Sequence, residues 1–513
     1  MIAVVLLVMI AVIALLVGAH WYVWRRIVRD TTRGPGAARR IGTVAICVLP
    51  LLSVGAVLAS RAGAPPWLER LLAWPGYYWL AILLYLVLAL LVGEAVRAVW
   101  LRLGDRRAGD GTAETSPPPD ARDAAAQADT APVPQAPSFG NGSGTGTGAP
   151  AGTRISASTG TDTATDTETA TVPQTDGTPV VAGADAATAD ASAAHEIKPA
   201  AGTPAVDTPA VDTPAAEAPA PAPAPAPESE PAPAALRAVS RRLFVSRVVG
   251  AGAVAATLGT VAHGTHTVLR GPRIKRVTVP LAKLPRSAHG LRIAVVSDIH
   301  IGPILGRSHT QRIVDVINSA QPDLIAVVGD MVDGTVAHLG SAAEPLAQLR
   351  ARHGSFFVTG NHEYYSHAGE WIDHVRELGL KPLENERVEI AGGFDLAGVN
   401  DIQGESIGHG PDFGKALGDR DRSRASVLLA HQPVVIHDAV EHGVDLQLSG
   451  HTHGGQLWPG NFVAELSNPT VAGLERYGDT QLYVTQGAGA WGPPVRVGTE
   501  SEVTIVQLAS RQA

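Results

Sequence analysis

The sequence predicts an α/β domain of roughly 240 residues that follows a helical membrane region and a long disordered linker. Three observations support this prediction. The composition changes twice along the 513 residues, and apolar runs of membrane-span length recur in the first hundred. In the last part of the chain, short apolar strands alternate with helical segments, which is typical of an α/β domain. That part is long enough to bury a sizeable core.

The net charge of −8 belongs to the middle of the chain. Between Gly104 and Leu236 there are 18 acidic and 5 basic residues, so the remainder of the chain is basic by five charges. The C-terminal domain has no basic run, and we therefore expect no nucleic-acid partner. The single cysteine, Cys47, excludes an intrachain disulfide and a cysteine-based zinc site. A metal ion would have to be held by His, Asp, Glu or Asn.

Residues 1–103 are predicted to form a membrane region with three transmembrane helices. Ile2 to Val23, Ile41 to Ser60 and Tyr77 to Val96 are nearly continuous apolar runs long enough to cross a bilayer. A cleavable signal peptide is the alternative for the first run, which lacks a basic start and a small-residue cleavage site. Arginines crowd the loop after the first run and follow the third. The positive-inside rule therefore places the N-terminus outside and the linker in the cytoplasm.

Residues 104–236 are predicted to be a disordered linker. They are rich in Pro, Ala, Thr and Asp and contain one aromatic residue, Phe139. Such a segment cannot bury enough apolar surface to offset its chain entropy. We assign it no chemistry.

Residues 237–268 are predicted to form an anchor helix that resembles a twin-arginine export signal. Ser240-Arg241-Arg242-Leu243-Phe244-Val245 precedes an apolar stretch rich in Gly and Ala. The alternative is an ordinary fourth span with two arginines at its inner end. Both interpretations place the following domain, residues 271–513, outside the cytoplasm.

Five short apolar strands of this domain are each followed by side chains that can bind a metal. The first three strands alternate with helical segments predicted at 308–319 and 343–350. Strands in such units end at one edge of the sheet, where ligands gather. The strands begin at Arg292, Leu324, Ser355, Val427 and Leu446, and the polar side chains after them are those of Asp298, His300, Asp330, Asp333, Asn361, His362, His431, His451 and His453.

In this order, the motifs resemble those of the calcineurin-like metallophosphoesterase family. The resemblance covers residues 292–508 and is strongest to the bacterial YkuE-like, membrane-associated branch. It implies a four-layer α/β/β/α sandwich. The motifs are Asp298-Ile-His300, Gly329-Asp330-Met-Val-Asp333, Gly360-Asn361-His362-Glu363, the lone His431, and Gly450-His451-Thr-His453-Gly-Gly-Gln456.

The resemblance implies a centre with two divalent metal ions, for which Mn, Fe and Zn suit the mixed carboxylate, amide and imidazole ligands. The implied ligands are Asp298, His300 and His453 for one ion, Asn361, His431 and His451 for the other, and Asp330 as the bridge. A hydroxide between the ions would attack phosphorus in line. His362, oriented by Asp333, would stabilise or protonate the leaving oxygen. Asp333 has the alternative role of capping the following helix.

Other residues near the motifs have simpler interpretations. Gly454 and Gly455 are predicted to allow a tight turn. Trp458, Phe462 and Trp491 are predicted to pack in the core or at the rim of the site, with contact to an envelope lipid as the alternative. The remaining histidines are predicted to be solvated: His309, His338, His353, His367, His409, His437 and His442.

The sequence therefore predicts a membrane-anchored, extracytoplasmic, metal-dependent phosphoesterase. Its partner is a phosphate-ester substrate, for which an envelope lipid and a wall polymer are candidates. One alternative is a pyrophosphate hydrolase that acts on a nucleotide-linked envelope lipid. The other is a non-catalytic sensor that binds the cell wall, but the complete ligand set disfavours it.

Overall fold

The computed structural model describes residues 2–110 and 241–512, all of which belong to one compact unit. The linker predicted at 104–236 lies outside the described residues except for its start at 104–110, which is helical. Residues 237–240 of the predicted anchor also lie outside them.

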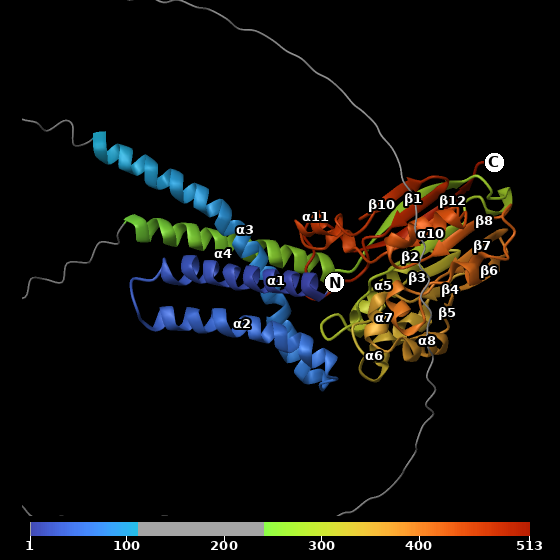
Figure 1. Cartoon of the computed structure of the whole chain (residues 1–513), viewed down its shortest axis with the longest axis horizontal. Helices are drawn as coiled ribbons and strands as arrows, with labels where there is room; N and C mark the ends of the chain where they lie inside the picture. Colours follow the sequence, from blue (N-terminus) through green and yellow to red (C-terminus); the bar gives the residue numbers. More distant parts are fainter. Residues whose placement is uncertain (1, 111–240, 513) are drawn as a thin grey trace, which may run out of the picture. The chain divides into compact units, whose positions relative to one another are not determined.

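Among the described residues, four helices are long and apolar enough to cross a membrane (Figure 1). They contain the three predicted spans and residues 241–268 of the predicted anchor, and a π-helical segment, Trp24–Arg29, continues the first of them. The second and third extend beyond the predicted spans because helical hydrogen bonding continues past the apolar run. The four are α1 (Ile2–Val23), α2 (Ala37–Arg61), α3 (Pro66–Asp110) and α4 (Arg241–Leu269).

Polar contacts join the arginine-rich ends of these helices. Arg26 Nε lies 2.5 Å from Glu94 Oε1, and Arg97 Nη2 lies 2.9 Å from Glu94 Oε2. Arg247 Nε donates to the Thr31 carbonyl at 2.9 Å. The segment after α1, the last third of α3 and the start of α4 therefore meet at a common basic end.

Two six-stranded sheets form the C-terminal domain. The strand order of the first sheet is β1 (Arg273–Leu281), β12 (Glu502–Ser510), β2 (Arg292–Val296), β3 (Leu324–Val328), β4 (Ser355–Val358) and β5 (Lys381–Pro382). The order of the second is β10 (Gly473–Tyr477), β11 (Thr480–Val484), β9 (Leu446–Ser449), β8 (Ala425–Leu429), β7 (Phe394–Gly398) and β6 (Glu386–Ile390). Strands β2 to β5 pair in parallel, as do β7, β8, β9 and β11. Only three residues separate α4 from β1, which pairs along its whole length with β12.

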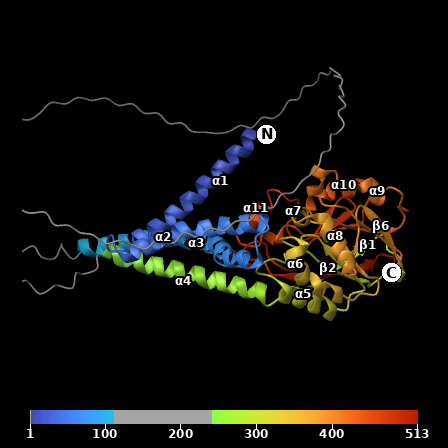
Figure 2. The same ribbon diagram turned by 90° about the horizontal axis from the view of Figure 1, so that it is seen from below.

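The domain has the four-layer α/β/β/α architecture that the sequence predicted. One apolar core lies between the sheets and includes Val295 and Leu429. A second apolar core, with Ile313 and Trp371, lies between the first sheet and the helices that cover it. Figure 2 shows these helices next to one another. These helices are α5 (Arg307–Ser319), α6 (Val336–Ala343) and α8 (Ala368–Glu377), and those on the second sheet are α9 (Phe413–Leu417) and α10 (Ile436–Glu441). Strands covered on both faces explain the uniformly apolar runs in the sequence.

Two local predictions were wrong. The helix predicted at 343–350 is the end of α6 followed by a 3₁₀ helix, Glu344–Gln348, because Pro345 lacks the N–H that would continue α6. His309 is buried rather than solvated, and neither of its ring nitrogens has a hydrogen-bond partner in the described part of the chain. His309 shares a helix face with Ile313 and Ile317 of the core. Burial, with Arg312 and Arg496 nearby, lowers the pKa of His309 to about 3.

Candidate metal centre

The nine predicted site residues meet where strands of both sheets end. β2, β3 and β4 approach from one sheet, and β8 and β9 from the other. The side chains form three groups whose possible ligand atoms lie within 4.8 Å of one another: Asp298 with His300 and His453, Asp330 with His431 and His451, and His300 with Asp333 and His362. Asn361, at the start of α7 (Asn361–Tyr365), joins them because its Oδ1 lies 3.1 Å from His451 Nδ1. Their individual roles remain predictions.

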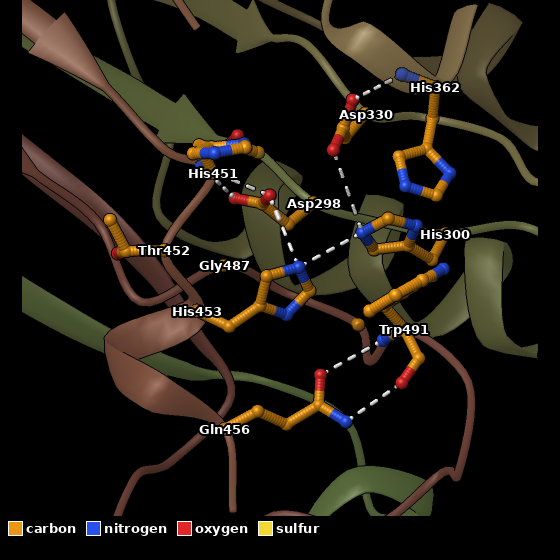
Figure 3. A network of polar contacts seen from close by, with 12 residues as sticks. Asp298, His300, Asp330, His362, His451, Thr452, His453, Gln456, Gly487 and Trp491 are labelled. Carbon is orange, nitrogen blue, oxygen red and sulfur yellow. Dashed lines mark hydrogen bonds and ion pairs between the residues drawn. The ribbon is translucent and has the colours of Figure 1, made fainter. Parts of the chain in front are cut away.

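The first cluster points three ligand atoms at one place (Figure 3). His453 Nε2 lies 3.3 Å from Asp298 Oδ1 and 3.0 Å from His300 Nε2. His300 Nδ1 lies 2.8 Å from Asp333 Oδ1, and since an ionised carboxylate only accepts, this nitrogen carries the proton. The lone pair of His300 Nε2 is therefore available to a metal. A carboxylate behind the distal nitrogen is the usual support for a metal-binding histidine.

The second cluster contains a buried histidine nitrogen, His431 Nε2, in surroundings that favour a cation. His431 Nδ1 lies 2.9 Å from the Val328 carbonyl, which can only accept, so Nδ1 is the donor. His431 Nε2 has no hydrogen-bond partner in the described residues, although it lies 3.1 Å from Asp330 Oδ2. Burial alone would lower the pKa of His431, but carboxylates led by Asp330 raise it well above its usual value. A divalent metal ion would supply the positive charge that this arrangement favours, so the residues fit such an ion.

The Asp330 carboxylate lies between the two clusters. Its Oδ2 is 3.1 Å from His431 Nε2 and 3.9 Å from His300 Nε2. Its Oδ1 accepts from the backbone N–H of His362 at 2.9 Å. Burial would raise the pKa of Asp330, but the neighbouring imidazoles hold it well below its usual value. Asp330 is therefore ionised and placed to serve both clusters.

His362 has the protonation and orientation of a proton donor. Its Nδ1 lies 2.7 Å from Asp333 Oδ1. Burial would lower the pKa of His362, but the hydrogen bond and charge of Asp333 raise it to about 9. The ring packs edge-on against Tyr365 and Trp491, with centroids 5.4 Å and 5.8 Å away.

Many of the candidate ligands have a strained backbone. A positive φ is uncommon outside glycine and costs about 1–3 kcal/mol where the surroundings impose it. Such angles cluster at functional sites. Five of the seven candidate ligands have one: Asp298, His300, Asp330, His451 and His453.

Glu363 supports the centre in a way that the sequence reasoning missed. Its buried carboxylate accepts from the backbone N–H groups of Asp330, Met331 and Gly360 at 3.0, 2.7 and 2.7 Å. Burial and the Asp330 charge raise the pKa of Glu363 to about 7, although the backbone donors lower it. The signal was present, because a Glu three residues after Gly360 can accept from the N–H at a helix start.

Arg496 and Gln456 hold the other side of the centre. Arg496 is fully buried and donates to the backbone carbonyls of Gly489 and His453 at 2.7 and 3.1 Å, while its Nη2 lies 3.2 Å from His453 Nδ1. The Gln456 amide makes two hydrogen bonds with the backbone of Trp491, at 2.9 and 3.0 Å (Figure 3). Gln456 ends a motif and could have been found there, whereas Arg496 is an isolated arginine with no pattern around it.

The turn after His453 depends on glycine, as predicted. Gly454 and Gly455 both have positive φ. A Cβ on Gly455 would overlap the backbone of Asn461 in α11 (Gly460–Ala464). The turn and α11 therefore pack directly on each other.

An open pocket of about 590 Å³ adjoins the second cluster. Asn361 and His451 of the centre are among the residues that line it. Among its described lining residues there is neither Lys nor Arg. The others are Tyr365, Ile402, Gln403, Glu405, Ser406 and Gln432. The pocket thus presents amide, hydroxyl and carboxylate groups to a molecule bound beside the centre.

Comparisons with known proteins agree with this site. The family described as calcineurin-like phosphoesterase matches residues 291–455. A transmembrane protein with metallophosphoesterase domain from Danio rerio is 40% identical over 259 residues, which cover 48% of this chain and 59% of that protein. An uncharacterized metallophosphoesterase of Helicobacter pylori is 37% identical over 272 residues, covering 52% of this chain and 72% of its own. The uncharacterized metallophosphoesterase YkuE of Bacillus subtilis is 28% identical over 291 residues, covering 54% of this chain and 99% of its own.

The fold, the paired ligand clusters and these relatives define a hydrolase domain for phosphoric esters. The chain belongs to the calcineurin-like metallophosphoesterase family. It spans about three fifths of the length of the Danio rerio relative. Its four apolar helices and the name of that relative favour association with a membrane.

Proposed function

We propose that this protein is a membrane-anchored, extracytoplasmic phosphoesterase with two divalent metal ions, of which Mn, Fe and Zn suit the ligands. The observation that carries the proposal is the position of Asp330. Its Oδ2 lies within 3.9 Å of a histidine nitrogen from each cluster, at 3.1 Å from His431 and 3.9 Å from His300. A single carboxylate within reach of two ligand sets suits a centre in which two metal ions lie close together.

The remaining residues divide the work of hydrolysis. When bound, two divalent ions supply Lewis acidity toward a phosphoryl oxygen and lower the pKa of a water molecule. His362, held by Asp333 and with its pKa raised to about 9, donates its Nε2 proton to the leaving oxygen. The N–H groups at the start of α7 can receive phosphate oxygens as well.

The distribution of charge supports a domain outside the cytoplasm. Arginines gather at the common basic end of α1, α3 and α4, and such ends face the cytoplasm. The domain follows the opposite end of α4. The twin-arginine interpretation of Arg241 and Arg242 remains part of the proposal and gives the same orientation.

The pocket beside the centre favours a single phosphate ester over a nucleotide-linked pyrophosphate. A second phosphate is usually paired with Arg or Lys, and none lines the described pocket, whereas Glu405 does. The alternative of a cell-wall sensor would not need His362 and Asp333 in hydrogen-bond contact beside the ligands.

A substrate screen of the full-length protein in detergent tests the proposal. The metal-free protein should be inactive, and loading with Mn, Fe or Zn should restore hydrolysis of a phosphomonoester or a phosphodiester. We expect little hydrolysis of a nucleotide diphosphate. Metal loading that restores no hydrolysis of any ester would contradict the proposed activity and leave the sensor.

Reporter fusions test the orientation. A reporter that works only outside the cytoplasm should be active after Ala513 and silent at Gly140, and the reverse pattern would overturn the proposed side. Changing both Arg241 and Arg242 to Lys should block export if they form a twin-arginine signal. Normal export of that variant would leave an ordinary anchor helix.

A further inference from the structure

The segment that follows the metal-binding turn exposes an unusual amount of apolar surface. Helix α11 has no buried residue, and the large apolar side chains around it are between 51% and 86% exposed. Helix α11 contains no charged residue, and the segment 457–469 around it contains one, Glu465. Exposed apolar patches of this kind mark sites that bind a protein, a membrane or a ligand. We call the set the apolar rim: Trp458, Phe462, Val463, Leu466 and the nearby Trp491.

The base of the apolar rim is attached to the membrane helices. Tyr85 of α3 donates its hydroxyl proton to the carbonyl of Trp458 at 3.0 Å. Leu457, Val495 and Val497 pack against Ala81, Tyr85 and Val261. The backbone N–H of Arg496 donates to the Gly264 carbonyl in α4 at 3.2 Å. The rim is thus continuous with an interface to two apolar helices.

The contacted residues lie inside the apolar spans rather than at their ends. A bilayer core about 30 Å thick is crossed by about 20 helical residues. Counted along α3 from Arg97 at its basic end, these residues reach the opposite surface of the core near Tyr77. Counted along α4 from Arg247, they reach that surface near residue 267. At 1.5 Å per residue, Tyr85 would lie about 12 Å below that level. By the same count, Val261 would lie about 9 Å below it. The apolar rim is therefore at the depth of the lipid headgroups and upper acyl chains, where Trp and other aromatic residues are favoured.

The apolar rim is also coupled to the metal centre. Gln456 holds the backbone of Trp491, whose ring contacts that of His362. Gly455 packs on Asn461 of α11. The distance along the chain from the ligand His453 to Trp458 is five residues. A membrane surface at the rim would therefore be close to the reacting groups.

We propose that the apolar rim inserts into the bilayer that the four helices span, and that the substrate is a phosphate ester in the headgroup of a membrane lipid. This inference rests on the proposed phosphoesterase function. The oxygen of a water molecule forms the new bond to phosphorus, and the ester P–O bond to the lipid or its headgroup alcohol breaks. The departing oxygen takes the proton of His362, and the proton that the attacking water loses is returned to His362 through the solvent. The rim adds the contact that brings such a phosphate to the centre.

The first test separates lipid from soluble substrates. The variant Phe462→Ser/Val463→Ser/Leu466→Ser alters exposed side chains, so the fold should be retained. The full-length variant is placed in vesicles of phosphatidylcholine that contain phosphatidate or phosphatidylglycerol. Its rate of hydrolysis of the anionic lipid should be lower than that of wild type by a factor of about ten or more. The reason is that each large apolar side chain contributes about 1.5–3 kcal/mol on burial. Its rate on a soluble nitrophenyl ester should stay within about twofold of the wild-type rate. A tenfold change would correspond to about 1.4 kcal/mol. The matched control is Ile407→Ser, another exposed aliphatic residue, which should change neither rate.

The second test measures depth without any turnover. Cys47→Ser removes the only cysteine, and a nitroxide on Phe462→Cys should then collide with oxygen more than with a water-soluble nickel chelate. A nitroxide on Ile407→Cys should show the opposite preference. A water-exposed label at 462, or one protected by a second copy of the chain, would overturn membrane insertion. Equal loss on both substrates, or no loss on lipid, would overturn the lipid assignment. Failure of metal-loaded wild type on every ester would instead overturn the phosphoesterase function.

Discussion

Replacing Asp330 with Asn should remove metal content and turnover together. Asn keeps an Oδ1 to accept from the His362 N–H but loses the negative Oδ2 that faces His431 and His300. Lewis-acid stabilisation by the metals is worth several kcal/mol, so turnover should fall by about 10³-fold. Metal analysis of the purified variant and its rate on a soluble ester measure both effects.

Asp315→Asn is the control for this variant. Asp315 is exposed on α5, outside the site, and its change removes the same charge without touching a ligand. It should keep full metal content and rate. If Asp330→Asn also keeps both metals and normal turnover, Asp330 does not bridge and the binuclear interpretation is wrong.

Replacing His362 with Ala should separate chemistry from metal binding. His362 is expected to donate a proton and not to hold a metal, so metal content should be unchanged. General acid catalysis contributes about 10²–10⁴-fold, so hydrolysis of an alkyl phosphate should slow by about that factor. A nitrophenyl ester, whose leaving group needs little protonation, should slow much less. Rates on both esters and the metal stoichiometry decide the matter.

His437→Ala serves as the matched variant, because His437 is exposed on α10 away from the clusters. It should leave both rates unchanged. Equal slowing of the two esters by His362→Ala would make His362 a phosphate-binding group, and loss of metal would make it a ligand.

The predictable part of this molecule is the part encoded by local pattern. The strands that end at Asp298, Asp330 and His431 are uniformly apolar because helices and a second sheet cover them, and this pattern is visible in the sequence. Their polar ends then meet by the geometry of parallel strands. The two-sheet sandwich was implied by the family resemblance that the motifs carry.

The remaining features depend on long-range contacts. Arg496 reaches His453 across 43 residues from a loop without periodicity. His309 follows the helical spacing of apolar residues but is itself polar, so composition predicts exposure where periodicity predicts burial. The prediction for Trp458, Phe462 and Trp491 left core, rim and lipid open, because sequence does not tell which apolar side chains lack a covering layer. The structure exposes all three.

If the proposed function holds, the short connection between α4 and β1 determines how the site meets its substrate. Three residues link Leu269 to Arg273, and they can extend by only about 10 Å. Under the proposed membrane anchoring, the domain is confined to a thin layer above one face of the bilayer. For a substrate in the same membrane, collision is a lateral, two-dimensional search, and the relevant concentration is molecules per unit area. Adding inert lipid would slow such a reaction at constant bulk concentration, whereas the rate on a freely dissolved ester would not change.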